Sequence, residues 1–165
     1  MKEFKVFSEP PEIHSNMLKD IESAKEFVYL ETFEFGNDKI GKQFLDVLIK
    51  KAKQGVKIKL LIDAWGSTAD KAFFEELISY GAEVRFFREF RYVVRIFSKN
   101  HERNHRKLLI IDNEISYLGS INITNKGIND RELVLRLKGN ITSCFIRSFH
   151  KSWEQGRFSK KRIKS

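Results

Sequence analysis

The sequence predicts an α/β protein built as a single layered α/β/α domain with a mixed, largely parallel central sheet. Strand-like and helix-like patterns alternate through the first half of the chain, which is typical of parallel strands joined by helical crossovers. In the second half, two strand-like segments follow each other across a tight turn, and this hairpin makes the predicted sheet mixed. With 165 residues, 41% of them hydrophobic, the chain is long enough to bury one core without disulfides.

The first half of the chain alternates between helices and strands. Residues 11–25 place Ile13, Met17 and Ile21 on one face of the first expected helix. Residues 38–55 form a second amphipathic pattern, which ends in basic residues and a glycine as helices commonly do. The other elements expected in this half are strands over 26–35, 56–63 and 82–87 and a helix over 68–81.

The second half is expected to hold the hairpin, one more strand and a closing helix. The hairpin pairs residues 105–112 with residues 114–119 across a short turn. Another strand is expected over 131–137, where apolar residues alternate with charged ones. Residues 140–156 then place aromatic and aliphatic side chains at helical spacing, which predicts a helix that covers the sheet.

The charge of the chain indicates its partners, and the absence of a linker indicates its domain organisation. The chain has 31 Lys and Arg against 22 Asp and Glu, and its net charge of +9 favours a polyanion, either nucleic acid or an anionic lipid surface. No linker divides the sequence, so we expect one domain over 1–156 and a basic tail over 157–165. The single cysteine, Cys144, can form no internal disulfide.

The sequence carries no sign of export or membrane insertion. Its first residues are charged and lack the apolar stretch of a secretory signal. No apolar run approaches the roughly 20 residues that span a bilayer. We therefore expect a cytoplasmic protein, either free or peripheral to the inner face of the membrane.

Residues 88–104 match neither the helical nor the strand period. The segment interleaves arginines with aromatic residues, which suits stacking and phosphate contact in single-stranded nucleic acid. It suits equally a wall that meets lipid headgroups, or an ordered surface loop that packs under a dimer. The residues concerned are Arg88, Phe90, Arg91, Tyr92, Arg95, Phe97 and Arg103.

The stretch NHRKLLIIDNEISYLGSINIT, residues 104–124, places polar residues at the edges of two core strands. His105 and Lys107 are two residues apart and project from the same side of a strand, whereas Asp112 has the opposite parity. If the hairpin pairs antiparallel, the end of its second strand returns beside the start of the first. Ser120 and Asn122 then lie close to the histidine and the lysine.

These residue types suit phosphoryl transfer. Imidazole can attack an electrophile or move a proton near neutral pH. Ammonium, hydroxyl and amide groups are donors that can hold the non-bridging oxygens of a phosphodiester. His105 is the one obvious metal ligand in the motif and Lys107 would repel a cation, so we expect no metal and no cofactor.

The spacing H-x-K-x(4)-D-x(6)-G-S-x-N resembles the signature motif of the phospholipase D superfamily. Residues 12–112 resemble the first half of bacterial cardiolipin synthases, and the single motif is similar to that of small bacterial endonucleases. In cardiolipin synthases the pair Gly119-Ser120 is commonly Gly-Gly, which is a departure of this chain from that group.

The resemblance implies a role for each motif residue. His105 would attack phosphorus and form a covalent phosphohistidine, with Lys107 and Asn122 binding the phosphoryl oxygens and Ser120 supporting them. Glu132, in NDREL, would orient the nucleophilic histidine. Asp112 completes the catalytic motif, although its parity favours a structural role.

The resemblance also implies a partner. A second histidine must protonate the leaving group, and this chain has one motif, so a homodimer with a shared active site is expected. Three functions stay open: phosphatidyl transfer or hydrolysis on a phospholipid, which we favour narrowly; a homodimeric endonuclease on DNA or RNA; and an inactive basic module that binds nucleic acid. Three other histidines are expected at the surface or on helix faces without a role: His14, His101 and His150.

Overall fold

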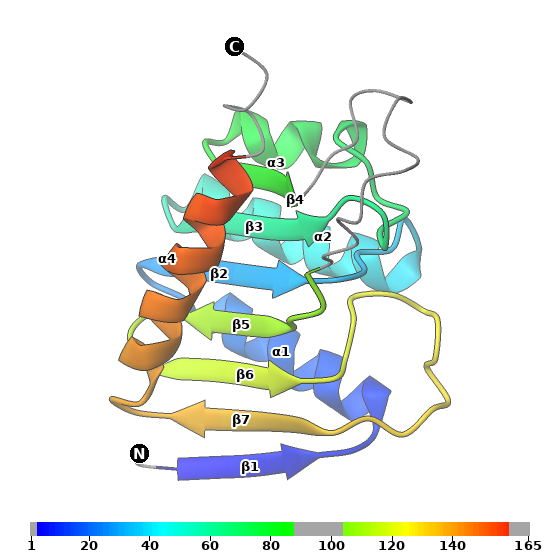
Figure 1. Ribbon diagram of the computed structural model, residues 1–165, viewed down its shortest axis with the longest axis vertical. Coiled ribbons are helices and arrows are strands. Elements are labelled where there is room, and N and C mark those ends of the chain that lie inside the picture. The colour runs from blue at the N-terminus through cyan, green and yellow to red at the C-terminus, as the bar shows by residue number, and fades with distance from the viewer. Residues whose placement is uncertain (1–2, 88–103, 159–165) are drawn as a thin grey trace.

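The computed structural model describes residues 3–87 and 104–158, and in this part of the chain seven strands form one sheet between two helical layers (Figure 1). The order of the strands across the sheet is β1-β7-β6-β5-β2-β3-β4. Their bounds are β1 Glu3–Phe7, β2 Phe27–Thr32, β3 Lys57–Asp63, β4 Glu83–Phe87, β5 Leu108–Ile111, β6 Ile115–Gly119 and β7 Val134–Lys138. The α/β/α class and the mixed sheet are therefore as predicted.

The balance of the sheet differs from the expectation of largely parallel pairing. Among the described strands, two pairings are parallel, β2 with β3 and β3 with β4, and the other four are antiparallel. Parallel neighbours need a long crossover, which helices supply between β2, β3 and β4. A short connection joins β5 to β6, and a hairpin of this kind permits antiparallel pairing alone.

The helical layers are unequal. The helices α1 (Pro10–Ser23), α2 (Lys39–Lys53) and α3 (Glu75–Ser79) lie behind the sheet in the view of Figure 1, and α4 (Thr142–Phe158) crosses its front. The side of α1 and α2 holds the larger core, in which Ile13, Phe44 and Leu60 are completely buried. On the α4 side, Phe149 and Trp153 pack on alternate residues of the central strands.

Two elements differ from their predicted form. The helix expected over 68–81 is reduced to a 3-10 turn over Ala72–Phe74 followed by the short α3. The strand β1 was not predicted, although EFKVF alternates apolar and charged residues as an edge strand does. Phe4 and Val6 are 59% and 54% exposed, so little burial marks this strand in the sequence.

The predicted hairpin is present in the expected register. Leu108 pairs with Leu118 and Ile111 with Ile115. Asp112 begins the turn with a positive φ of 51°, a conformation that Asp and Asn adopt more readily than most residues. The predictions for residues 88–103 and for the last residues of the basic tail, 159–165, lie outside the described chain.

Candidate active site

Polar residues gather along one edge of the sheet. The strands β2, β3 and β6 end there, and β5 starts there, as Figure 1 shows. His105 and Lys107 lie just before the first residue of β5, and Ser120 and Asn122 lie just after the last residue of β6. The antiparallel register of the two strands therefore brings both halves of the motif to this edge, as the sequence predicts.

An aromatic ring that the sequence analysis did not identify brings the histidine and the lysine together. The exposed imidazole of His105 stacks on Phe33, with 4.2 Å between ring centroids and 12° between planes. Nζ of Lys107 lies 5.3 Å from the centroid of the same phenylalanine and donates a 2.8 Å hydrogen bond to the carbonyl of His105. In the described chain no group hydrogen-bonds to the ring nitrogens of His105, so both are available to a ligand.

Lys107 occupies a mixed electrostatic environment. Burial lowers the pKa of its ammonium below the ordinary value, and the nearby carboxylates of Glu132 and Glu34 oppose that shift. Desolvation penalises the charged form, and a bound anion would compensate for it. A phosphate group at this edge would therefore find a cation that lacks full solvation.

Ser120 and Glu132 form a second unit of the site. The hydroxyl of Ser120 donates to the carboxylate of Glu132 and accepts a 3.0 Å hydrogen bond from the amide of Leu133. In the single chain the carboxylate of Glu132 is thus held by Ser120. No hydrogen bond joins it to His105 within the described residues, and its expected role in orienting a histidine stays a proposal.

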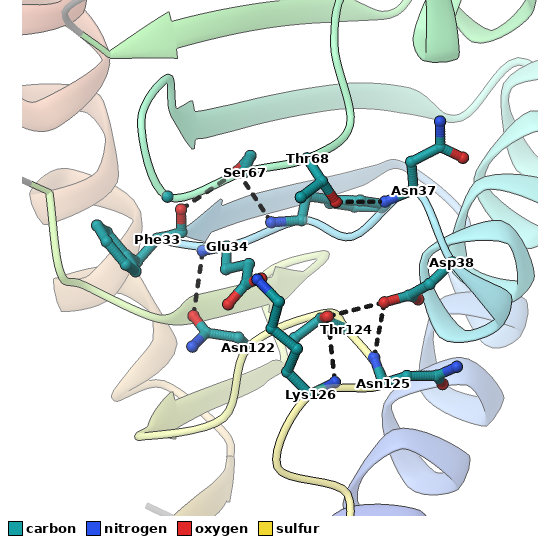
Figure 2. A network of polar contacts seen from close by, with 12 residues as sticks. Phe33, Glu34, Asn37, Asp38, Ser67, Thr68, Asn122, Thr124, Asn125 and Lys126 are labelled. Atoms are coloured by element: carbon teal, nitrogen blue, oxygen red, sulfur yellow. Dashed lines mark hydrogen bonds and ion pairs between the residues drawn. The ribbon is translucent and has the colours of Figure 1, made fainter.

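Asn122 is held in one orientation from two sides. Its Oδ1 accepts a 3.1 Å hydrogen bond from the amide of Glu34, as Figure 2 shows, and its carbonyl accepts a 2.9 Å hydrogen bond from Nε2 of His14. The first bond leaves the Nδ2 amide group of Asn122 to donate elsewhere. This orientation suits the phosphate-binding role expected of the residue.

His14 lies on a helix face, as expected, but on the buried face of α1, where it makes a contact that the sequence did not predict. The side chain lies on α1, is 3% exposed and packs edge-on against Phe44. Burial lowers the pKa of this imidazole, which keeps it neutral. The residue therefore supports the backbone of Asn122 from the core, a role that no sequence spacing indicates because 108 positions separate the two residues.

Hydrogen bonds tie the loop after β2 to the loop after β6 (Figure 2). The carboxylate of Asp38 caps α2 through the amide of Gly41 and accepts hydrogen bonds from Thr124 Oγ1 at 2.7 Å and Asn125 N at 2.8 Å. Burial opposes ionisation of Asp38, but these hydrogen bonds outweigh it and lower the pKa of the carboxyl. Glu34 also binds Lys126, with 2.6 Å between Oε1 and Nζ.

The loop after β3 joins the same assembly. Ser67 Oγ donates to the carbonyl of Phe33 at 3.2 Å and accepts from the amide of Phe35 at 2.9 Å, and Thr68 Oγ1 accepts from the amide of Asn37 (Figure 2). Three loops far apart in the sequence are thereby fixed relative to one another. The edge of the sheet is a rigid platform for the motif residues.

Asp112 lies at the opposite end of β5 and takes no part in this edge. Its carboxylate accepts hydrogen bonds from the amides of Lys25 at 3.0 Å, Glu26 at 2.9 Å and Phe27 at 2.9 Å. It therefore ties the start of β2 to the hairpin turn. This position does not support the catalytic role expected for Asp112. Its hydrogen bonds to backbone amides fit the structural role that its place in the strand pattern favoured.

No helix of the described chain combines the length and apolar character needed to cross a membrane.

The chain is similar in sequence to proteins named cardiolipin synthases. A family model described as "Cardiolipin synthase, PLD-like domain" matches residues 17–153. Cardiolipin synthase 1 of Staphylococcus aureus (strain MRSA252) is 35% identical over 154 residues, 89% of this chain and 31% of that protein. The major cardiolipin synthase ClsA of Bacillus subtilis (strain 168) is 36% identical over 148 residues, 84% of this chain and 30% of that protein. The chain thus spans about a third of the length of these relatives.

Structural comparison gives a consistent fold. Nuc from Salmonella typhimurium, described as a phospholipase D family member, matches with a TM-score of 0.72 at 22% identity, covering 93% of this chain and 95% of that one. NucT from Helicobacter pylori matches with a TM-score of 0.70 at 22% identity, covering 93% and 98%. Phosphatidylserine synthase of Haemophilus influenzae Rd KW20 reaches 0.66 at 12% identity, covering 87% and 35%. These likenesses confirm the predicted α/β/α fold.

Proposed function

The chain belongs to the phospholipase D-like family, and on that premise we propose that it is a phosphodiester-transferring enzyme that forms a covalent phosphohistidine on His105. The proposal rests on one observation. The imidazole of His105 is exposed, stacks on Phe33 and has both ring nitrogens unpaired within the described chain, next to the ammonium of Lys107. An imidazole with a free ring nitrogen beside a hydrogen-bond donor can act as a nucleophile toward phosphorus.

The proposed reaction has two displacements. A ring nitrogen of His105 forms a bond to phosphorus while the bond from phosphorus to the leaving alcohol breaks, and the alcohol oxygen takes a proton from a second imidazolium. That imidazole then removes a proton from water or an acceptor alcohol, whose oxygen attacks phosphorus and breaks the P–N bond. Lys107 and Asn122 donate to the phosphoryl oxygens throughout and stabilise the charge that develops there. Ser120, whose hydroxyl donates to Glu132, supports them at the phosphate-binding site. The proposed chemistry uses no metal.

The second imidazole is proposed to be His105 of another copy. A homodimer whose two-fold axis passes through the site would supply it. Glu132 is then proposed to orient one of the paired histidines.

An exposed apolar face supports the dimer. Leu118 pairs with Leu135, and Leu135 pairs with Val6. These residues extend a row of apolar side chains from the core under α4 to the outermost strand, β1. Figure 1 shows that α4 leaves β7 and β1 uncovered on this side. Leu133, 62% exposed, lies on the same face and follows Glu132 directly. An apolar face that adjoins the site is suited to burial by a second copy.

The favoured substrate is a phospholipid. The support is the identity of 35% and 36% to proteins named cardiolipin synthases, together with the net charge of +9, which favours an anionic lipid surface. The protein would act peripherally, at the cytoplasmic face of a membrane.

A nucleic acid is the alternative substrate. The support is the similarity of fold to Nuc, with a TM-score of 0.72 over 93% of this chain. The same positive charge would serve a phosphate backbone as well as a lipid headgroup.

A side-by-side assay separates the two proposals. Purified protein and a His105→Ala control are incubated with phosphatidylglycerol vesicles, single-stranded DNA, double-stranded DNA and RNA. We expect turnover of the phospholipid that the control lacks, and no inhibition by EDTA. Cleavage of nucleic acid alone would favour the nuclease. Turnover at the wild-type rate by the control would overturn the phosphohistidine, and a protein inactive on all four would point to a basic binding module.

A further inference from the structure

Two buried carboxylates bind the residue that precedes the proposed catalytic histidine. Asn104 is 8% exposed, and the carboxylates of Glu31 and Asp63, at the ends of β2 and β3, are completely buried. The Nδ2 group of Asn104 donates a 2.7 Å hydrogen bond to Oε1 of Glu31, and its backbone amide donates a 3.1 Å hydrogen bond to Oδ2 of Asp63. The asparagine is thus anchored to two parallel strands of the sheet.

The remaining acceptor of Asn104 shapes the backbone around His105. Its Oδ1 accepts a 3.2 Å hydrogen bond from the amide of Arg106, two residues further along. This pattern is an Asx turn, in which a side chain replaces the first carbonyl of a backbone turn. His105 occupies the middle of that turn. The three hydrogen bonds of Asn104 therefore fix the backbone position from which the imidazole of His105 extends.

The other side of His105 is fixed as well. The guanidinium of Arg106 lies 3.5 Å from Oε2 of Glu31 and donates a 2.6 Å hydrogen bond to Oγ of Ser152 on α4. Burial raises the pKa of Glu31, while Arg106, Asn104 and Ser152 oppose that shift. The buried carboxylate of Glu31 thus interacts with the residues on both sides of His105, Asn104 and Arg106.

Stability alone does not explain this arrangement. A buried charge is costly, and well-packed apolar residues of similar volume are often as stabilising as a buried ion pair. The groups gathered here bond on both sides of one residue, His105, whose own ring nitrogens make no hydrogen bond in the described chain. Buried polar networks of this kind restrict the backbone to one geometry.

We propose that Asn104 is a positioning residue for the catalytic histidine, and that Glu31 and Asp63 hold it in the orientation that aims the His105 imidazole at phosphorus. The inference rests on the proposed function, because it assigns the network to the nucleophilic step. In-line attack tolerates little displacement, and a shift of about 1 Å in a reacting group can lower the rate about 100-fold.

The test uses bis(4-nitrophenyl) phosphate, an activated phosphodiester that favours neither lipid nor nucleic acid. We expect Asn104→Ala to lower kcat about 100-fold with KM within about threefold of wild type. The kcat of Asn104→Ser should lie between those of wild type and Asn104→Ala, because the serine hydroxyl can form the same turn more weakly. The matched control is Asn16→Ala on α1, where the amide bonds only the carbonyl of Glu12 among the described residues and kcat should not change.

A reversed pair distinguishes positioning from bulk stability. Asn104→Asp should lower kcat, because the introduced carboxylate cannot donate to Glu31. Glu31→Gln keeps an acceptor oxygen for Asn104 but removes the negative charge that faces Arg106, so it should lower kcat less. In the double variant the donor and the acceptor are exchanged, so the introduced amide can donate to the introduced carboxylate. The second oxygen of that carboxylate can still accept from the amide of Arg106. We expect the double variant to regain at least about tenfold in kcat over Asn104→Asp.

The outcomes separate the two levels of the proposal. Wild-type turnover by His105→Ala, assayed in parallel, would remove the proposed function and the positioning role together. An inactive His105→Ala with unchanged kcat in the Asn104 variants would overturn the positioning role alone. If Asn104→Ala does not fold, Asn104→Ser decides. If neither folds, or if the double variant regains melting temperature without kcat, Asn104 is a structural residue and the proposal fails.

Discussion

At one end of β5 the imidazole of His105 is exposed, stacks on an aromatic ring and has no hydrogen bond within the described chain. At the other end, the carboxylate of Asp112 accepts hydrogen bonds from three consecutive backbone amides, those of Lys25, Glu26 and Phe27. The two lie seven positions apart, roughly 23 Å along an extended chain. The same motif therefore contains His105, whose polar atoms are free to bind a ligand, and Asp112, whose polar atoms are hydrogen-bonded within the fold.

This contrast divides the motif by the state of its polar atoms. A side chain that serves chemistry keeps its polar atoms unpaired until the substrate arrives, and its neighbours carry the cost of holding it in place. A side chain that serves the fold has its partners in the chain already. Substitutions at the two ends of β5 should therefore separate activity from stability.

The strongest change should be a loss of activity at the catalytic end. His105→Ala should lower turnover about 10⁴-fold or more, because the covalent step is lost, and leave the free energy of unfolding within about 0.5 kcal/mol. Turnover and urea denaturation of the same preparation measure both quantities. The corresponding control is His150→Ala on α4, whose ring packs against Tyr29 and Phe149 and which should keep its turnover per folded molecule. A large loss of stability in His105→Ala would blur the proposed division.

The next change should be a loss of stability at the other end. Asp112→Ala should lower the free energy of unfolding by about 2–3 kcal/mol, because three backbone amides lose a charged acceptor. Asp112→Asn should cost less, since it keeps an acceptor oxygen and tolerates the positive φ of 51°. Asn113→Ala, one residue along the turn, should change stability by about 0.5 kcal/mol or less. Urea denaturation measures all three. A turnover per folded molecule that falls about 100-fold in Asp112→Ala would return this residue to the catalytic group.

The sequence could predict the hairpin but not its supports. The spacing of the motif, the strand parity and the turn were enough to bring Ser120 and Asn122 beside His105 and Lys107, and to separate Asp112 from them. These are local regularities, set by the period of a strand and by hairpin geometry.

The supports depend on contacts that no local pattern encodes. Phe33 stacks on a histidine 72 positions away, Asn104 bonds Glu31 73 positions away, and His14 bonds Asn122 across 108 positions. The strand β1 was missed for a related reason, because an exposed edge strand leaves little hydrophobic signal. The segment 88–104 was left ambiguous, yet its last residue, Asn104, is the one with the most direct hold on the histidine.

The weakest change expected from a single residue is a pH dependence at the catalytic end. Since burial lowers the pKa of Lys107 below 10.5, its ammonium should lose a proton at a lower pH than a free lysine does. KM for a phosphodiester should then start to rise at a lower pH than the loss of a proton by an ordinary lysine would predict.

The matched variant is Lys107→Arg, because a guanidinium stays charged over this range and its KM should not rise in the same way. A pH profile of the two proteins with one substrate makes the comparison. Equal slopes for both would show that another group controls the dependence.

The proposed shared active site would require the imidazoles of two copies to act on one phosphate. Wild-type protein is mixed with an equal amount of His105→Ala protein, subunit exchange is confirmed with differently tagged copies, and turnover is measured against the wild-type fraction. If the site needs both histidines, mixed dimers are inactive and the equal mixture keeps about one quarter of the wild-type activity, with a quadratic dependence on that fraction. A linear dependence, with about half of the activity kept, would show that each copy works alone and would contradict the shared site.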